Sequence, residues 1–195
     1  IAVFAENGVE TALANLGGLI GGASVVPINF HLTAEEVAYI LSDSGARMVF
    51  LGPETAERGL EAAALAGIDQ IIGWRCEIPG LKSWSEWLAA SSPGEPDTSI
   101  PPRPNLLYTS GTTGRPKGTH LPPTMFAGGD TVEAHLQNLK LNPLAALGPH
   151  LVVGPMYHTG PLSGARLLAA GAPSVILTKF DPENTLKTIA EYKTA

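Results

Sequence analysis

The chain has 195 residues, 44% hydrophobic and 15% charged, which is too apolar for an intrinsically disordered protein and long enough to bury a substantial core. Its net charge of −6 disfavours nonspecific binding to nucleic acid or to anionic membranes, so we expect no nucleic-acid partner. The single cysteine, Cys76, excludes an intrachain disulfide and a cysteine-rich zinc site, and it favours a reducing compartment such as the cytoplasm.

The uncharged stretch 11–30 has the length of a membrane span, but Asn15, Pro27 and four glycines interrupt it, so we expect no transmembrane segment. Along the chain, including this stretch, short β-branched runs alternate with helical stretches. We expect strands at 1–5, 24–28, 47–51 and 70–72. We expect helices at 10–21, from Ala34 onward, at 53–66 with Pro53 in the first turn, and after Ser83.

The segment 91–104 carries five prolines and suits neither a helix nor a central strand, so we interpret it as a surface connector. After it we expect a strand at 106–109, a glycine-rich loop to Gly118, a helix at 123–139 and a strand at 151–153. The remaining elements are a helix ending at Ala170, a strand at 174–177 and a helix started by Asp181-Pro182.

This alternation predicts an α/β fold with largely parallel sheets covered by helices. We expect a first α/β lobe at 1–90, the connector at 91–104 and a second lobe at 105–195. The chain opens within a strand pattern and ends within a helix pattern, which favours a fragment of a larger protein.

The most informative run is Tyr108-Thr-Ser-Gly-Thr-Thr-Gly-Arg-Pro-Lys-Gly118. Its three glycines permit backbone amides to converge on an anion, hydroxyl side chains add donors, and Arg115 and Lys117 add positive charge. A flexible polar linker would need neither the cations nor the strand before the loop. Lys117 precedes Gly118 and no Gly-x-Gly-x-x-Gly occurs in the loop, so the Walker and dinucleotide motifs are absent.

This run resembles the adenylate-forming superfamily of acyl-CoA synthetases, firefly-type luciferases and peptide-synthetase adenylation domains. Gly154-Pro-Met-Tyr-His-Thr-Gly160 resembles a second block of that family, in the same order along the chain. The segments Val25-Val-Pro-Ile-Asn and 32–41 are similar to the acyl-CoA synthetase branch. The resemblance spans essentially the whole chain but corresponds to only part of the family's large N-terminal domain.

The resemblance implies ATP-dependent conversion of a carboxylic acid to an acyl-adenylate and then to an acyl-CoA, with ATP, Mg²⁺ and coenzyme A taking part. It assigns phosphate binding to the loop and to Lys117, and magnesium to the Thr109 hydroxyl. The residues that it places at the nucleotide are Thr109, Ser110, Gly111, Thr112, Thr113, Gly114, Lys117 and Gly118. Such chemistry depends on positioning and on electrostatic stabilisation of the leaving pyrophosphate.

The resemblance also implies an acyl pocket formed by Met156, Tyr157, His158 and Gly160. His158 would position or gate the acyl group, because a carboxylate nucleophile has no proton to lose and a neutral imidazole can donate to it. No acidic residue occurs between Lys140 and Lys179 to hold a substrate ammonium, which favours a plain fatty or aromatic acid.

Other residues have simpler interpretations: Trp74, Trp84 and Trp87 are expected to pack in the core, and His31 and Asp43 to lie on the surface. The run from Lys117 to Pro123, which includes His120, departs from the family pattern and leaves the local strand pairing open. The family's adenine-contacting Gly-Tyr-Gly-x-Thr-Glu block, its ribose-binding aspartate and its C-terminal lysine are absent, so the chain alone is not expected to complete the reaction. The alternatives are a noncatalytic ATP- or phosphate-binding module and a luciferase-like monooxygenase.

Overall fold

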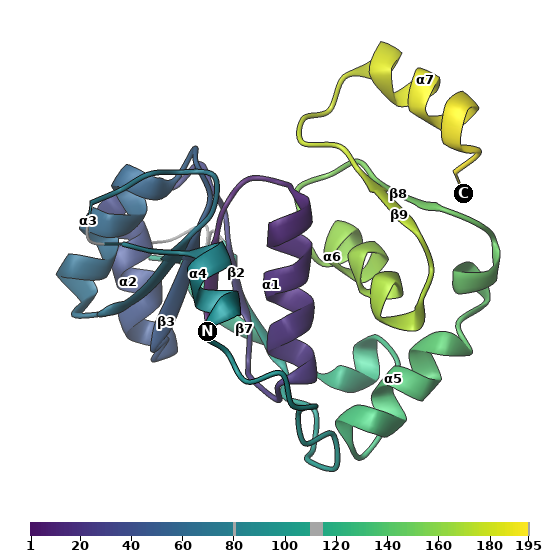
Figure 1. The fold of residues 1–195 in the computed structure, drawn as a ribbon, viewed down its shortest axis with the longest axis horizontal. Helices are drawn as coiled ribbons and strands as arrows, with labels where there is room; N and C mark the ends of the chain where they lie inside the picture. The colour runs from purple at the N-terminus through teal and green to yellow at the C-terminus, as the bar shows by residue number, and fades with distance from the viewer. Residues whose placement is uncertain (80, 110–114, 195) are drawn as a thin grey trace.

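The largest sheet has five parallel strands in the order β2-β1-β3-β4-β5 (Figure 1). The computed structural model describes residues 1–79, 81–109 and 115–194. In the sheet, Ala2 lies opposite Val26 on one side and Val49 on the other. The strands are β1 (Ala2–Phe4), β2 (Val26–Ile28), β3 (Met48–Leu51), β4 (Gln70–Gly73) and β5 (Lys82–Ser83). Four of them confirm predicted strands, and β5 is an additional two-residue edge strand.

Helices cover both faces of this sheet, because successive strand residues point to opposite sides. Phe4 and Leu51 pack with α2 (Ala34–Ser44) and α3 (Ala56–Ala66) on one face. Val3 and Phe50 pack on the other face, against α1 (Val9–Ile20) and the tryptophans around α4 (Trp84–Ala89). There the three tryptophan rings stack edge-on or tilted against Phe50, which confirms their expected packing role.

Local capping signals start these helices where the sequence predicts, with one exception. The Thr33–Glu36 and Ser83–Glu86 capping boxes both form, at the starts of α2 and α4. The predicted start of α3 at Pro53 is wrong. Thr55 closes a turn on Gly52, accepting from its amide at 3.1 Å and donating to the Phe4 carbonyl, so Pro53 belongs to that turn and the helix begins at Ala56.

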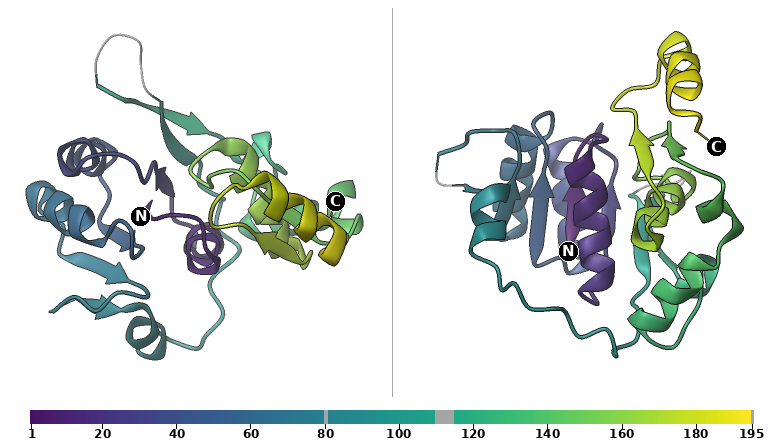
Figure 2. Two further views of the ribbon diagram at one scale, coloured as in Figure 1. Left: turned by 90° about the horizontal axis from the view of Figure 1, so that it is seen from above. Right: turned by 45° about the vertical axis from the view of Figure 1, so that its right-hand side comes forward.

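The proline-rich residues 91–104 form no helix or strand and run from α4 to the rest of the chain (Figure 2). The carbonyls of Ile100 and Thr98 accept hydrogen bonds from Val132 and Glu133 in the first turn of α5 (Val132–Lys140), at 2.8 and 3.0 Å. These contacts satisfy amides that a helix N-terminus leaves without an internal partner.

An antiparallel pair follows, made of β6 (Asn105–Thr109) and β7 (Lys117–Leu121). The prediction of loop up to Gly118 is therefore wrong, since Lys117 and Gly118 pair with Thr109 and Tyr108. The backbone of β6 supplies the hydrogen-bonding partners that hold this glycine- and threonine-containing run extended. β6 also lies beside β2, with the Leu106 amide donating to the Val25 carbonyl at 2.9 Å.

The predicted continuous helix at 123–139 is also wrong. A 3-10 helix spans Pro123–Met125, and α5 starts only at Val132, with Thr131 as its N-cap. Between them Gly128 and Gly129 take φ angles of +64° and +102°, which end a right-handed helix.

The last part of the chain builds a small parallel pair, β8 (His150–Val152) and β9 (Ser174–Ile176), preceded by the 3-10 helix η2 (Pro143–Ala146). Helix α6 (Thr159–Ala165) continues into the 3-10 helix η3 (Arg166–Ala170), and α7 (Pro182–Tyr192) starts at the predicted Asp181 cap. α1 lies between two groups of elements, of which the first is the five-stranded sheet with α2 to α4 and the second is the β8–β9 pair with α5 to α7 (Figures 1 and 2). Its Ala12 joins the core of the second group, with Val152, Met156 and Ala165.

These layers confirm the predicted α/β class with mainly parallel pairing. Among the described residues, no helix has both the length and the apolar character needed to cross a bilayer.

Candidate functional site

Thr109 and Lys117 lie opposite each other at the end of the β6–β7 pair, and both are exposed. They bracket the glycine-rich run, of which Ser110, Gly111, Thr112, Thr113 and Gly114 lie outside the described residues. Gly118 faces Tyr108 across the pair, and a Cβ at this glycine would lie 3.2 Å from Cζ of the tyrosine ring. The strand thus carries glycine where the aromatic ring covers its backbone.

Tyr157 and His158 belong to the segment that leads into α6, where His158 is the N-cap residue. The His158 amide donates to the Pro155 carbonyl at 3.0 Å, and its side chain caps no helix amide. His158 and Gly160 are exposed, whereas Met156 is only 1% exposed and packs in the core beside α1. The structure therefore separates Met156 from the open face that carries His158.

A pocket of about 390 Å³ brings the two sequence motifs together. Thr109 and Pro116 contribute to one wall and Tyr157, His158 and Thr159 to another, and we call this cavity the β6 pocket. Its remaining lining comes from the end of β2, from α2 and from β6, namely Pro27, Ile28, Asn29, Leu32, Glu36, Ile40, Leu107 and Tyr108. The cavity therefore combines apolar side chains with polar ones, which include the Glu36 carboxylate, the Asn29 amide, hydroxyl groups and the His158 imidazole.

Four rings form a continuous aromatic row beside this pocket. His31 and Phe30 have centroids 4.2 Å apart, Phe30 meets Tyr157 edge-on at 5.7 Å, and Tyr157 and His158 are 4.4 Å apart. Residues that are 127 positions apart in the chain thus meet through the Phe30–Tyr157 contact. The row joins the β6 pocket to a second cavity.

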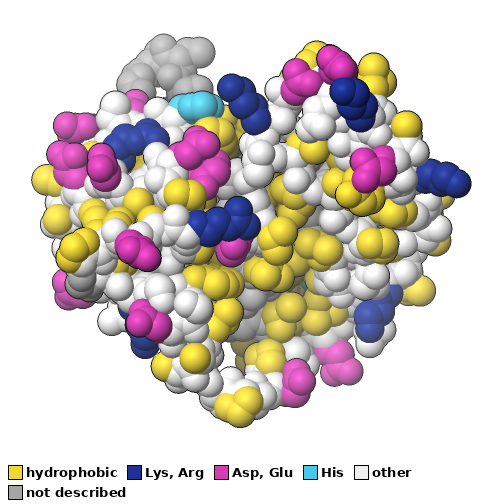
Figure 3. Space-filling view, turned by 45° about the horizontal axis from the view of Figure 1, so that its top comes forward, with side chains coloured by type: hydrophobic (Ala, Val, Ile, Leu, Met, Phe, Trp, Pro, Cys, Tyr) yellow, Lys and Arg dark blue, Asp and Glu magenta, His cyan; other side chains and the backbone are white. Residues whose placement is uncertain are grey.

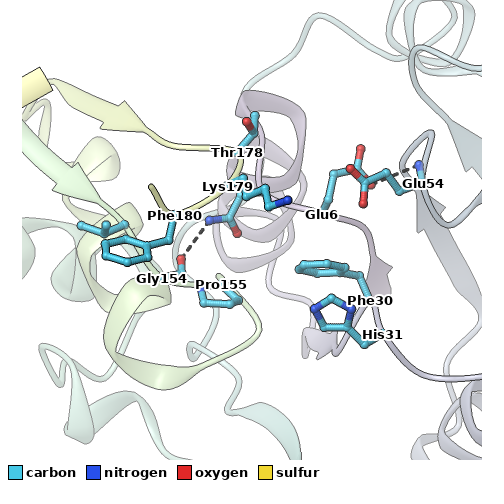
Figure 4. A pocket seen from close by; sticks show the side chains of 11 residues that line it. Glu6, Phe30, His31, Glu54, Gly154, Pro155, Thr178, Lys179 and Phe180 are labelled. Atoms are coloured by element: carbon cyan, nitrogen blue, oxygen red, sulfur yellow. Dashed lines mark hydrogen bonds between the residues drawn. The ribbon is translucent and has the colours of Figure 1, made fainter. Parts of the chain in front are cut away.

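The second cavity, the edge pocket, has a volume of about 740 Å³ and lies where β1, β2, β3, β8 and β9 end (Figure 4). Figure 3 shows hydrophobic side chains gathered in a hollow between the two groups of elements. Phe30, Pro155 and Phe180 supply apolar surface to the edge pocket, and Lys179 points across it toward Glu6 (Figure 4). Ligands of open α/β sheets bind at this edge, where the strand order reverses.

Burial raises the pKa of Glu6 above the usual value for a glutamate, an effect that its backbone hydrogen bonds partly offset. Its carboxylate accepts from the Glu54 amide at 3.4 Å, in the reversal between β1 and β3. In the β6–β7 pair, burial and the hydrogen bond to Asp43 raise the pKa of Tyr108, so this hydroxyl stays protonated and acts as a donor.

Asn7 ties the His158 segment to the sheet. Its amide nitrogen donates to the carbonyls of Gly154 and Leu177 at 2.8 and 3.1 Å, and its oxygen accepts from the Met156 amide at 2.9 Å. The side chain is 6% exposed, so these bonds form where water cannot replace them. Asn7 therefore fixes the backbone immediately before Tyr157 and His158.

Sequence analysis did not identify Asn7, Glu6, Phe30 or Lys179 as site residues. The available signal was positional, because each follows a strand by one to three residues and parallel strands place such residues at one edge. His31 and Asp43 are exposed, as expected, yet His31 lines the edge pocket and Asp43 bonds Tyr108.

Comparisons with known proteins identify the family to which this chain is similar. The chain is 31% identical over 203 residues to the long-chain-fatty-acid–CoA ligase FadD13 of Mycobacterium tuberculosis, which covers 99% of the chain and 37% of that ligase. It is 30% identical over 178 residues to the indoleacetate–CoA ligase of Aromatoleum aromaticum, which covers 88% of the chain and 34% of the relative. The chain thus spans little more than a third of these relatives' lengths.

Among solved structures, the inhibitor-bound N-terminal domain of FACL13 from M. tuberculosis superposes on the whole chain with a TM-score of 0.73 at 26% identity, over 48% of that domain. A putative long-chain-fatty-acid CoA ligase from Rhodopseudomonas palustris shares the fold, with a TM-score of 0.77 at 21% identity. The family model for AMP-binding enzymes matches residues 1–195. The chain therefore belongs to the AMP-binding enzyme family.

Proposed function

We propose that this chain supplies the phosphate-binding strands and one wall of the acyl pocket in an enzyme that activates a carboxylic acid with ATP and transfers it to coenzyme A. The observation that carries the proposal is the β6 pocket, which Thr109 and His158 line together. In this reaction a carboxylate oxygen attacks the α-phosphorus and pyrophosphate leaves, after which the CoA thiol attacks the acyl carbon and displaces AMP. The relatives that support it are named as CoA ligases.

The end of the β6–β7 pair suits the triphosphate. Lys117 and Thr109 are exposed and directly opposed in the strand register, so a cation and a hydroxyl donor belong to the same end of the hairpin. Charge-assisted contacts of this kind stabilise the negative charge that gathers on leaving pyrophosphate. The roles proposed for residues 110–114 lie outside the described residues and remain predictions.

Magnesium would be held at this end mainly by the nucleotide. The described residues include no group of three His, Cys, Asp or Glu side chains that could hold a metal ion by themselves. Mg²⁺ bound to substrate phosphates keeps several waters and needs only one or two protein ligands, to which the Thr109 hydroxyl oxygen can contribute. The ion would neutralise phosphate charge.

The acid would occupy the β6 pocket, with its carboxylate near His158. Ile28, Ile40 and Leu107 give the cavity apolar lining. The segment around His158 has no acidic residue at 141–178 to hold an ammonium group, and Glu36 of α2 supplies a carboxylate to the opposite part of the lining. These features favour a plain fatty or aromatic acid. Coenzyme A would approach from the edge pocket, where Lys179 offers a cation and the aromatic row leads toward His158.

The test is acid-dependent exchange of pyrophosphate into ATP by the full-length protein that contains this chain, with fatty and aryl acids. We expect exchange with at least one acid. We also expect Lys117→Ala to raise the KM for ATP by about tenfold, the effect of losing one contact to a charged phosphate, and to leave the KM for the acid unchanged. Lys140→Ala, which removes an exposed lysine at the end of α5, is the control.

Two results would contradict the proposal. Absence of exchange with every acid tested would reject carboxylate activation as the reaction. Unchanged ATP kinetics in Lys117→Ala would reject the placement of the triphosphate at the β6–β7 pair.

A further inference from the structure

Helix α2 contacts the chain on both flanks of the glycine-rich run, at β6 and at Arg115, two residues before β7. The Tyr108 hydroxyl on β6 donates to the Asp43 carboxylate at 2.6 Å. On the other flank, the Arg115 guanidinium lies 5.2 Å from the centroid of the Tyr39 ring. Tyr39 and Asp43 are four residues apart on α2 and so lie on one face of the helix.

α2 is itself firmly anchored. Its inner face buries Val37, Ile40 and Leu41 to 1% exposure or less. A capping box starts the helix, and Gly45 ends it in the left-handed conformation with φ of +64°. Because the helix is fixed at both ends and along its inner face, Tyr39 and Asp43 are held in defined positions beside the chain that they contact.

Near their open end the strands are supported on the β6 side, where Tyr108 packs against the core cluster that includes Val37 and Ile40. From Lys117 to His120 every residue of β7 is exposed, and only Leu121 is buried. β6 bonds the sheet at Leu106, three residues before Thr109. The contacts with Asp43 and Tyr39 involve Tyr108, which precedes Thr109, and Arg115, which lies two residues before Lys117.

We propose that Asp43 and Tyr39 are positioning residues, which hold Tyr108 and Arg115 and thereby fix the separation and orientation of Thr109 and Lys117. Neither residue lines the β6 pocket. The charge-assisted bond to Asp43 fixes the position of Tyr108 in β6. The cation–π contact with Tyr39 fixes the position of Arg115, which leads into β7. The consequence for ATP use rests on the proposed function, but the geometry of the strands does not.

The first arm of the test uses the 195-residue chain alone. Trypsin can cleave the Lys117–Gly118 bond, which requires local opening of β7, and cleavage of Lys140–Leu141 at the end of α5 serves as an internal reference. We expect Asp43→Ala to accelerate cleavage at Lys117 about three- to tenfold relative to Lys140, the range for losing one charge-assisted bond at a partly exposed site.

Matched variants separate positioning from general loosening. Asp43→Asn keeps an acceptor for Tyr108 and should restore most of the protection, and Tyr39→Phe should keep the ring that Tyr39→Leu removes. Glu61→Ala, which removes an exposed carboxylate from α3, should change nothing. Equal cleavage ratios in Asp43→Ala, Tyr39→Leu and the unmodified chain would overturn the proposal.

The second arm measures ATP and acid kinetics in the full-length protein. We expect Asp43→Ala to raise the KM for ATP several-fold with the KM for the acid unchanged, and Asp43→Asn to recover the lower value. If the unmodified protein activates no acid, the proposed function fails while the cleavage ratios still decide the positioning claim. If acid is activated and Asp43→Ala alters neither the cleavage ratio nor the KM for ATP, the positioning claim alone fails.

Discussion

The five-stranded sheet and the β6–β7 pair differ in how they are held in place. Phe4 and Leu51 at the centre of the sheet are completely buried, with helices on both faces. In the β6–β7 pair, one strand is exposed along four of its five residues, and side-chain contacts from α2 support the open end. The difference teaches that the buried sheet provides the rigid frame, while the candidate site lies on elements attached to it at a few identifiable points.

Asn7 makes three hydrogen bonds between the sheet and the second group of elements, so we expect its substitution to lower the free energy of unfolding the most. Asn7→Ala removes three hydrogen bonds and leaves the Gly154 and Leu177 carbonyls and the Met156 amide without their partner. We expect the free energy of unfolding to fall by about 3 kcal/mol, since unsatisfied buried groups cost about 1–3 kcal/mol each and water recovers part. Urea denaturation of the chain measures this value.

Asn138→Ala is the matched control for Asn7. It removes a single exposed bond from the Asn138 side chain to the Ala127 carbonyl, so we expect a loss of less than about 1 kcal/mol. Equal losses in the two variants would show that the second group of elements does not depend on Asn7.

The break before α5 gives a second comparison, between adjacent glycines. A Cβ at Gly129 would lie 2.6 Å from the His135 backbone nitrogen, and its φ is +102°, so Gly129→Ala should destabilise the fold by about 2–3 kcal/mol. Gly128 has a φ of +64° with no atom within 4 Å of an added Cβ. Gly128→Ala should therefore cost only about 1 kcal/mol, from the left-handed backbone alone.

Thermal or urea unfolding of both glycine variants checks the comparison. A Gly129→Ala protein as stable as Gly128→Ala would contradict the described packing of the turn against α5.

The smallest expected effect concerns pH. His135 is fully buried, and its Nδ1 lies 2.6 Å from the Gly128 carbonyl, so we place the proton on this nitrogen. The pKa of His135 is lowered, mainly by burial and to a smaller extent by the positive charge of Arg166. The hydrogen bond to Gly128 acts in the opposite direction. In the unfolded chain, His135 takes up a proton below the ordinary histidine pKa of about 6.5, whereas in the folded chain burial opposes this protonation. The free energy of unfolding therefore falls as the pH drops below that value.

His135→Asn keeps a donor for the Gly128 carbonyl and removes the titration. We expect its urea midpoint to fall less between pH 7.5 and 5.0 than that of the unmodified chain. The same substitution at the exposed His120 is the control. Identical pH dependence in His135→Asn and the unmodified chain would exclude His135 as the source.

Sequence analysis succeeded where local interactions decide the structure. The Thr33–Glu36 box, the Ser83–Glu86 box and the Asp181 cap each involve residues within one helical turn, and all three form. The sheet strands followed from β-branched runs that are buried on both faces. The phosphate-loop and His158 motifs were recognised from the sequence, and their flanking residues meet at the β6 pocket.

The predictions were wrong or incomplete where contacts between distant parts of the chain determine the structure. β7 is a strand because β6 supplies its hydrogen-bonding partner, and Lys117 and Gly118 carry little strand signal of their own. Pro53 suits a first helical turn, but the bond from Thr55 to Phe4 on another strand moves the start of α3. Asn7 acquires its role only from carbonyls and an amide that lie 147 to 170 residues away in the chain.

The most direct test of the central claim is a crystal structure of the full-length protein with ATP and a fatty or aryl acid. We predict that the triphosphate lies between Thr109 and Lys117 and that the acid lies in the β6 pocket beside His158. A nucleotide bound elsewhere, with the end of the β6–β7 pair free of phosphate, would contradict the account.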